Sequence, residues 1–257
     1  MMAIRVIKVG GRPQLDPALP AALAGAHRAA PGSLVVVHGG GDEVSTLQKH
    51  YGVEAQFSGG RRMTSALDID IIRMALSGSA NKRLVAALND AGVSAVGLSG
   101  EDAGLLRATP TDRARFGFVG TPSGVNEKLV RHLLAGGYLP VLSPVSRSDD
   151  PDAGATLNVN GDDAASALAV ALAAEELLLV SDVEGVRVNG GAVMRLDADE
   201  AQRLLENGTA AGGMAAKLEA ALAALEGGVA RVRISDIAAI GRTDRGTVLT
   251  RVGSVCA

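Results

Sequence analysis

Two glycine-rich turns, each placed directly after a run of β-branched residues, are the strongest candidates for a chemical site in this sequence. The first is Lys8-Val9-Gly10-Gly11 and the second is His38-Gly39-Gly40-Gly41. Glycines let backbone N–H groups approach anionic oxygens without interference from Cβ, and a following helix N-terminus adds partial positive charge. This geometry suits a phosphoryl group, although either turn alone is also compatible with an ordinary tight connection between a strand and a helix.

Three further polar segments follow in the second half of the chain. An Asn/Asp cluster over 158–163 opens a predicted helix, residues 181–186 end a predicted strand, and Gly212-Gly213 begins a helix that carries Lys217 in its first turns. Each segment alone could be a cap, a turn or a solvated charge. In this order, and together with the two glycine turns, they predict one ligand site outside the carboxyl ends of parallel strands.

Several familiar sites are excluded by the glycine and histidine positions. The sequence contains neither G-x-G-x-x-G nor G-x-x-x-x-G-K-[ST], so neither a dinucleotide-binding unit nor a P-loop is expected. It contains no G-x-S-x-G elbow, and its four histidines lack the spacing of metal ligands. We therefore expect no metal site built from protein side chains.

Short aliphatic runs alternate with Ala/Leu-rich segments along the chain. The runs predict strands over 4–9, 34–37, 95–98, 138–142, 177–180 and 231–234. Apolar residues at helical spacing predict a helix after Thr64 as N-cap and another after Asn81. The residues expected to face the core are Leu67, Ile71, Ile72, Met74 and Ala75 in the first helix and Leu84, Val85 and Leu88 in the second. A helix over about 162–173 joins the two halves without a flexible tether. The pattern predicts an α/β fold with a mostly parallel sheet shared by two lobes and covered by helices on both faces.

Composition limits the partners and the compartment. The 257 residues carry 25 Lys and Arg against 28 Asp and Glu, a net charge of −3 that does not favour nucleic acid. The longest apolar run, 164–174, is too short to span a membrane, and the N-terminus lacks the pattern of a secretory signal. The single cysteine, Cys256, cannot form an internal disulfide. We expect a cytoplasmic protein without nucleic-acid or membrane partners.

At this point the sequence resembles the amino acid kinase family, and within it most closely the members that phosphorylate N-acetyl-L-glutamate. The resemblance runs from about Ile4 to Thr250 and rests on ten segments: 8–11, 38–41, 60–64, 81–82, 96–100, 117–120, 137–141, 158–162, 181–185 and 213–217. It implies a three-layer αβα sandwich, with an acceptor-binding and dimerisation lobe over 1–173 and an ATP-binding lobe over 174–257.

The resemblance also implies a reaction: transfer of the γ-phosphoryl group of ATP, with Mg²⁺, to the γ-carboxylate of N-acetyl-L-glutamate. That carboxylate is ionised at neutral pH, so the reaction needs no general base and instead needs positive charge for two anions to meet. By resemblance Lys8 and Lys217 supply this charge, Asp162 holds both ammonium groups, and Gly11 donates a backbone N–H group.

The acceptor is assigned by resemblance to Gly40, Gly41, Arg62, Asn158 and Asn160. Arg62 would clamp its α-carboxylate bidentately. The assignments of Arg62 and Asn158 have alternatives.

Arg62 could form a surface ion pair with Asp68 or Asp70, Arg61 could hold the clamp position, and Asn158 could close an Asx turn in the 147–160 hairpin. For His38 we expect a structural hydrogen bond to backbone at the end of its strand.

The nucleotide is assigned by resemblance to a second set, mostly through backbone contacts. This set comprises Gly10, Ser181, Asp182, Val183, Gly185, Val186, Arg187, Thr209, Ala210, Ala211 and Met214.

Two other functions are alternatives to the phosphorylation of free N-acetyl-L-glutamate. One is the kinase of lysine biosynthesis that acts on α-aminoadipate attached to a carrier protein, and the other is a regulatory member that binds nucleotide without turnover. The short 58–64 segment and the net charge favour free N-acetyl-L-glutamate, and the presence of both lysines and Asp162 favours catalysis.

A homodimer is expected from the same resemblance. Only three residues precede the first predicted strand, so we expect no N-terminal linking helix and no inhibition by arginine. The interface would be built on the helix over 65–76 and the edge of the sheet.

Overall fold

An eight-stranded sheet forms the middle layer of the computed structural model, which describes residues 3–58, 61–150, 156–188 and 190–251. Its strand order is β14-β16-β15-β11-β1-β2-β8-β5, and every neighbouring pair is parallel except β15 with β16. The strands of this sheet are β1 (Arg5–Val9), β2 (Leu34–His38), β5 (Ala95–Ser99), β8 (Leu139–Ser143), β11 (Glu176–Val180), β14 (Arg195–Asp197), β15 (Arg231–Ser235) and β16 (Thr247–Thr250). The expected mostly parallel sheet is confirmed.

The remaining strands form smaller units beside this sheet. A closed barrel comprises β6 (Leu106–Pro110), β7 (Val119–Val125), β9 (Val145–Ser148) and β10 (Thr156–Val159). Two short hairpins pair β3 (Phe57–Ser58) with β4 (Arg61–Arg62) and β12 (Arg187–Val188) with β13 (Gly191–Ala192).

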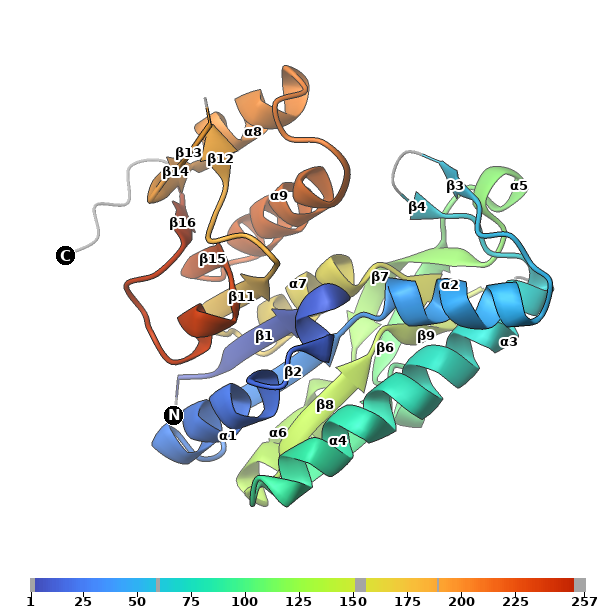
Figure 1. The fold of residues 1–257 in the computed structure, drawn as a ribbon, viewed down its shortest axis with the longest axis horizontal. Helices are drawn as coiled ribbons and strands as arrows, with labels where there is room; N and C mark the ends of the chain where they lie inside the picture. Colours follow the sequence, from blue (N-terminus) through green and yellow to red (C-terminus); the bar gives the residue numbers. More distant parts are fainter. Residues whose placement is uncertain (1–2, 59–60, 151–155, 189, 252–257) are drawn as a thin grey trace.

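Helices cover both faces of the large sheet and give the three layers (Figure 1). The α-helices of the described ranges are α1 (Leu19–Ala29), α2 (Gly41–His50), α3 (Ala66–Ile72), α4 (Asn81–Asp90), α5 (Arg113–Phe116), which lies apart from the large sheet, α6 (Glu127–Ala135), α7 (Gly161–Ala171), α8 (Ala198–Glu206) and α9 (Gly212–Glu226). Short 3₁₀ helices occupy Arg12–Leu15, Asp102–Gly104 and Ile237–Ile240, and a π-helix occupies Arg73–Ala80.

Alternation along the strands separates the core into two parts. Val6, Leu177 and Leu179 face α6, α7 and α9, whereas Ile7 and Leu178 face α1 and α4. Side chains of successive strand residues point to opposite faces, so this alternation places helices on both sides of the sheet. The architecture is a three-layer αβα sandwich.

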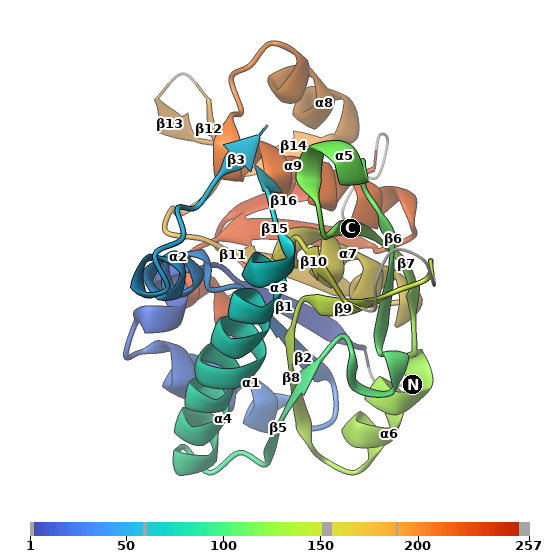
Figure 2. The same ribbon diagram turned by 90° about the vertical axis from the view of Figure 1, so that its right-hand side faces the viewer.

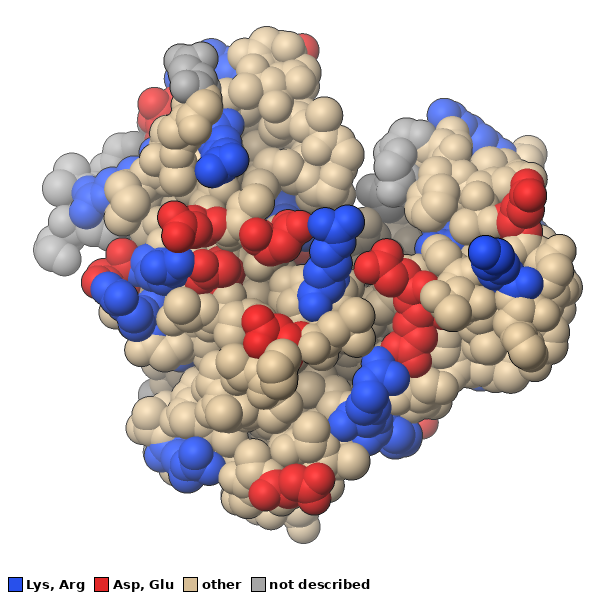
Figure 3. Space-filling view, in the orientation of Figure 1, with Lys and Arg blue, Asp and Glu red and all other residues tan. Residues whose placement is uncertain are grey.

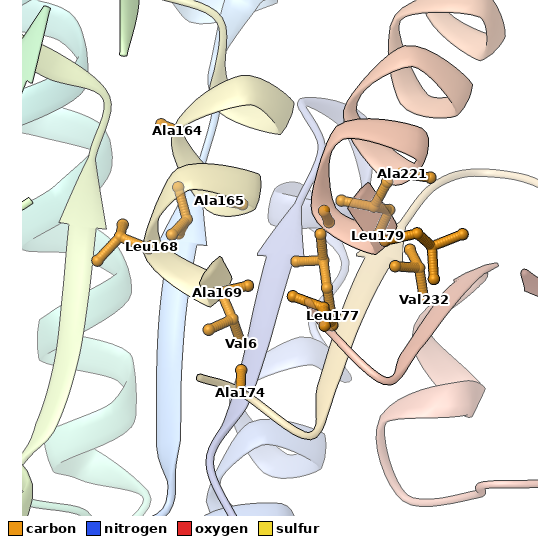
Figure 4. Close-up of a cluster of buried hydrophobic side chains, with 14 of the residues drawn as sticks. Val6, Ala164, Ala165, Leu168, Ala169, Ala174, Leu177, Leu179, Ala221 and Val232 are labelled. Atoms are coloured by element: carbon orange, nitrogen blue, oxygen red, sulfur yellow. The ribbon is translucent and has the colours of Figure 1, made fainter. Parts of the chain in front are cut away.

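Small residues let α7 lie close to the sheet. Ala164, Ala165 and Ala169 are fully buried there, and Ala221 of α9 packs beside Leu179 and Val232 (Figure 4). Because alanine adds only a methyl group, the backbone of α7 approaches β1 and β2 and its N-terminus is brought near the loops that follow these strands. This packing fixes the position of Asp162 in the first turn of α7.

The segment 66–90 is one continuous helical run, where the sequence predicted two capped helices. The N-cap of α3 is Ser65, which exchanges hydrogen bonds with Asp68 in a capping box, so the assignment of Thr64 as cap is wrong by one residue. Asn81 is the first residue of α4, as the sequence predicts, but it does not cap a separate helix, because the π-helix passes directly into α4 (Figure 2). Leu67 and Met74, expected in the core, are 52% and 44% exposed.

A buried charge cluster lies among the first residues of three adjacent strands. Glu176 of β11 pairs with Arg233 at 2.6 Å, Arg5 at 2.8 Å and Arg231 at 3.0 Å. Burial would raise the pKa of Glu176, but the arginines, Arg233 foremost, outweigh burial and hold the pKa below its ordinary value. Arg233 also donates to three backbone carbonyls, including that of Ala239, so the cluster ties the 239–245 segment to the sheet.

No helix in the described ranges is both long enough and apolar enough to cross a membrane.

Candidate active site

The loops that follow parallel strands meet at one edge of the sheet. Strands β1, β2 and β11 lie side by side and end at Val9, His38 and Val180, so the two glycine turns and the segment from Ser181 onwards are neighbours. The face in Figure 3 is hollowed by a notch between the α8–α9 side and the β3–β4 side. Acidic and basic side chains are interspersed on this face, which does not present a field of one sign.

Lys8 and Lys217 meet on a single carboxylate. Lys8 Nζ lies 2.8 Å from Asp162 Oδ1, and Lys217 Nζ lies 3.2 Å from Asp162 Oδ2. Lys8 comes from the end of β1, Lys217 from the second turn of α9 and Asp162 from the first turn of α7, so three elements converge. Lys217 donates a hydrogen bond to Oδ2, and Lys8 forms an ion pair with Oδ1, so each carboxylate oxygen faces one ammonium group.

These three charges are removed from water and therefore interact strongly. The Asp162 side chain is 5% exposed and that of Lys217 is 11% exposed. Burial would raise the pKa of Asp162, but the two ammonium groups hold it below its ordinary value. Burial and the charge of Lys8 lower the pKa of Lys217, and Asp162 opposes that change. The carboxylate of Asp162 is thus a shared counter-charge for two cations that lie side by side.

A cavity of about 240 Å³ opens on the Lys8 side of this triad. Among the residues predicted for the acceptor and for catalysis, its lining includes Lys8, Gly11, Gly40, Gly41, Arg62, Asn158, Asn160 and Asp162. It also includes Val44, Phe57, Ile72, Leu76, Val119 and Pro144, which the sequence did not single out. One end of the cavity is therefore charged and part of its wall is apolar.

Gly40 is a position that requires glycine. Its φ is +145°, and a Cβ added there would lie 2.7 Å from Leu76 Cδ2 in the π-helix. Gly40 is the N-cap of α2, which begins at Gly41. The glycine turn thus brings the backbone and a helix N-terminus to the cavity wall.

Arg62 reaches the cavity from the β3–β4 hairpin. Its Nη2 donates to Gly41 O at 3.1 Å and to Ser45 Oγ at 2.8 Å, and its guanidinium lies 4.7 Å from the centre of the Phe57 ring. An ion pair of Arg62 with Asp68 or Asp70 is not among the contacts of the described residues. The side chain of Arg61, the alternative for the clamp, lies outside the part of the chain that the structure describes.

The polar residues of β2, β10 and α7 are positioned by hydrogen bonds. Asn158 donates to Thr64 Oγ1 at 3.1 Å, and Asn160 caps α7 by accepting from the backbone N–H of Asp162 at 2.8 Å. His38 is fully buried, with Nδ1 2.9 Å from Gly39 O and Nε2 3.0 Å from Asn81 Nδ2. Burial lowers the pKa of His38 to about 4, so the imidazole is neutral and its expected structural hydrogen bond is confirmed.

A second cavity of about 510 Å³ lies on the Lys217 side. Gly11 and Gly41 line both cavities, so the two spaces adjoin at the glycine turns. Of the residues predicted for the nucleotide, the second lining includes Gly10, Ser181, Asp182, Val183 and Met214.

The other residues predicted for the nucleotide do not line this cavity. Val186 is buried, and its N–H donates to Thr247 Oγ1 at 2.8 Å, while Gly185 packs so closely on Thr247 that a Cβ would lie 2.5 Å from Oγ1. Arg187 is exposed in β12, and Thr209, Ala210 and Ala211 form the connection into α9.

Metal ligands are sparse around the triad. The described residues contain no group of three or more His, Cys, Asp or Glu side chains placed to hold an ion. Asp162, the carboxylate at the centre, is already engaged by two ammonium groups. The chemistry of the site is therefore that of fixed cations and backbone donors, which suits an anionic ligand.

The apolar wall is the part of the site that sequence reasoning missed. Ile72 and Leu76 belong to an apolar stripe at helical spacing, and this spacing is the same for a side chain in the core and for one that lines a cavity. Phe57 is an isolated aromatic residue before a glycine pair, a weak signal for a binding wall.

Comparison with known proteins identifies relatives of this chain. Residues 3–236 match the model of the amino acid kinase family. The acetylglutamate kinase of Chloroflexus aurantiacus is 44% identical over 252 residues, covering 97% of this chain and 98% of the relative.

Two further relatives support the same family assignment. The acetylglutamate kinase of Geobacillus kaustophilus is 41% identical over 89% of this chain and 88% of its own. The crystal structure of smu.665 from Streptococcus mutans superposes with a TM-score of 0.85 at 30% identity, covering 96% of this chain and 98% of that one. The chain therefore belongs to the amino acid kinase family.

Proposed function

We propose that this protein transfers the γ-phosphoryl group of ATP to the γ-carboxylate of N-acetyl-L-glutamate, a step of arginine biosynthesis. The observation that carries the proposal is the pair of buried lysines that share Asp162 where the two cavities adjoin. The names of the relatives, which span nearly the whole chain, support the same acceptor. The product is N-acetyl-L-glutamyl 5-phosphate.

The reaction is an in-line displacement at phosphorus. A γ-carboxylate oxygen forms the new bond to the γ-phosphorus, the bond to the bridging β–γ oxygen breaks, and ADP leaves with that oxygen. No proton moves, because the acceptor carboxylate is already ionised at neutral pH. Catalysis then consists of alignment and of stabilising the charge that spreads over the transferred group.

Each part of the site has a role in this displacement. Lys8 lines the 240 Å³ cavity and Lys217 the 510 Å³ cavity, so the two cations approach the transferred group from the acceptor side and the nucleotide side. The backbone N–H groups of Gly11 and Gly40 are additional donors. Mg²⁺ enters as part of the nucleotide substrate, since this ion keeps most of its ligands as phosphate oxygens and water.

Trapping of the product tests the proposal. The purified protein is incubated with MgATP, hydroxylamine and one acceptor from a panel of N-acetyl-L-glutamate, glutamate, aspartate, UMP and carbamate. Hydroxamate formation with N-acetyl-L-glutamate is the expected result. Absence of hydroxamate with N-acetyl-L-glutamate, together with ADP release from another acceptor of the panel or from α-aminoadipate bound to a carrier protein in a separate assay, would refute it.

The assembly and the compartment are part of the same proposal. We infer a cytoplasmic homodimer that pairs through the helical segment from Ser65 to Leu76 and the edge of the sheet, which is formed by β5. Leu67 and Met74 on this segment are large apolar side chains left partly exposed in the single chain, which supports an interface there. Light scattering that gives the mass of one chain or of a larger ring would contradict it.

A further inference from the structure

A buried amide lies directly behind the guanidinium of Arg62. Gln48, in the last turns of α2, is 1% exposed. Its Oε1 accepts a hydrogen bond from Arg62 Nη1, and its Nε2 donates to Asp68 Oδ1 at 2.6 Å. Asp68 is itself fixed at the start of α3, because its Oδ2 accepts the backbone N–H of Ser65 at 2.8 Å. The chain Arg62–Gln48–Asp68 thus links the hairpin to two helices.

The orientation of this amide is determined by its two partners. A guanidinium can only donate and an ionised carboxylate can only accept, so the carbonyl end of Gln48 must face Arg62 and the amino end must face Asp68. Hydrogen bonds from Gln48 and Ser65 help to overcome burial and keep the pKa of Asp68 below its ordinary value. The amide is therefore held in one direction and in turn holds Nη1 of Arg62 in one direction.

The neutral amide also keeps a negative charge away from direct contact with the guanidinium. A carboxylate bonded directly to Arg62 would compete with an incoming carboxylate for the same donors. With Gln48 between them, Asp68 fixes the geometry while the charge of Arg62 stays available to the cavity. Ser45, a neutral hydroxyl, holds Nη2 in the same way at 2.8 Å.

We propose that Gln48 is a positioning residue for acceptor recognition: it orients the Arg62 guanidinium toward the α-carboxylate of the acceptor. This inference rests on the proposed function, because it concerns the acceptor end of that site. Gln48 acts through Arg62 and its effect falls on binding of the acceptor, leaving the nucleotide and the transfer step nearly unchanged.

The first test replaces the amide with an apolar side chain of similar length. Gln48→Met should raise the KM for N-acetyl-L-glutamate by about 10- to 150-fold, the range for losing one hydrogen bond to a charged group. The KM for ATP and kcat should stay within about twofold of the wild type. The matched control is Gln202→Met, which makes the same replacement at an exposed position of α8.

A truncated acceptor separates positioning from a general structural defect. 4-Acetamidobutanoate keeps the acetamido group and the reacting carboxylate but lacks the α-carboxylate. If Gln48 acts through the contact of Arg62 with that group, Gln48→Met should leave kcat/KM for this poor acceptor nearly unchanged. An equal loss with both acceptors would overturn the inference.

A double-mutant cycle with Arg62→Lys provides the second measurement. Lysine lacks the planar fork, so Gln48→Met should add little to the acceptor KM in that background, whereas independent effects would multiply. If Gln48→Met does not fold, Gln48→Asn, whose amide is too short to reach both partners, should give the same rise in KM. An unchanged acceptor KM in a folded variant of either kind refutes the role of Gln48, whereas absence of wild-type turnover with N-acetyl-L-glutamate refutes the proposed function instead.

Discussion

Replacing Asp162 with asparagine should separate the charge of this residue from its shape. The carboxylate lies 2.8 Å from Lys8 Nζ and 3.2 Å from Lys217 Nζ, and all three side chains are nearly buried. Asp162→Asn leaves two ammonium groups without their shared counter-charge. Removing one member of a buried ion pair costs about 3–5 kcal/mol, so we expect a marked loss of stability at neutral pH.

The kinetic effect follows from the pKa of Lys217. Burial and Lys8 already lower this pKa, and Asp162 opposes them, so the variant should lower it further. Because Lys217 stabilises the transferred group only when charged, activity is lost as the pH rises through that pKa. The alkaline limb of the kcat profile should therefore move to lower pH, with kcat at its maximum reduced by about 10²–10³-fold.

A coupled assay of ADP release across a range of pH, together with urea unfolding, measures both effects. Asp163→Asn is the matched control, because it removes a neighbouring carboxylate from the same first turn of α7 at a position that lines a different cavity. If Asp162→Asn kept kcat within about threefold of the wild type and left the alkaline limb in place, the assigned electrostatic role would be wrong.

Three further outcomes are expected. Arg62→Lys should raise the KM for N-acetyl-L-glutamate and leave that for ATP unchanged in steady-state assays, because a point charge replaces a fork; the same effect from Arg61→Lys alone would place the clamp at Arg61 instead. Gly40→Ala should weaken binding of the acceptor in calorimetry by about 5- to 150-fold, because a side chain at a φ of +145° strains the backbone and the new Cβ would lie 2.7 Å from Leu76 Cδ2; wild-type affinity would contradict this. Glu176→Gln should lower the free energy of unfolding by about 3–5 kcal/mol at pH 7, as measured by urea unfolding. The difference from the wild type should shrink as the pH falls below 4.5, the ordinary pKa of this carboxyl, because its folded pKa is lower still. An equal difference at pH 7 and below pH 4.5 would refute the interpretation as an ion pair.

The sheet and its loops were predictable because their signals are local. Runs such as 34–37 and 177–180 are aliphatic on both faces, as expected for strands covered by helices on both sides. The continuous helical run from 66 to 90 was harder to predict, because an asparagine at position 81 is typical of a helix N-cap. In the fold its amide instead donates to Val141 O at 2.9 Å and contacts His38, a partnership across more than forty residues.

The residues of the candidate site also differ in how well the sequence predicts them. The charged and glycine residues stand out because few structural roles require that chemistry at those positions. The sequence does not indicate a role for Gln48, because a glutamine between Leu47 and Lys49 is typical of the solvent-exposed face of an amphipathic helix. Its burial follows from how α2 packs against α3 and the π-helix, which no local pattern encodes.

The pairing of β1 with β11 has a consequence for how the chain folds. Five residue pairs from Arg5↔Glu176 to Val9↔Val180 join strands from opposite sides of residue 173, where the acceptor and nucleotide lobes are expected to divide. Separating the chain there would leave each fragment with a long, unpaired, apolar edge, the kind of edge that templates aggregation. We therefore expect the two predicted lobes to fold as one cooperative unit, and we expect neither fragment to be a building block that could be moved to another protein on its own.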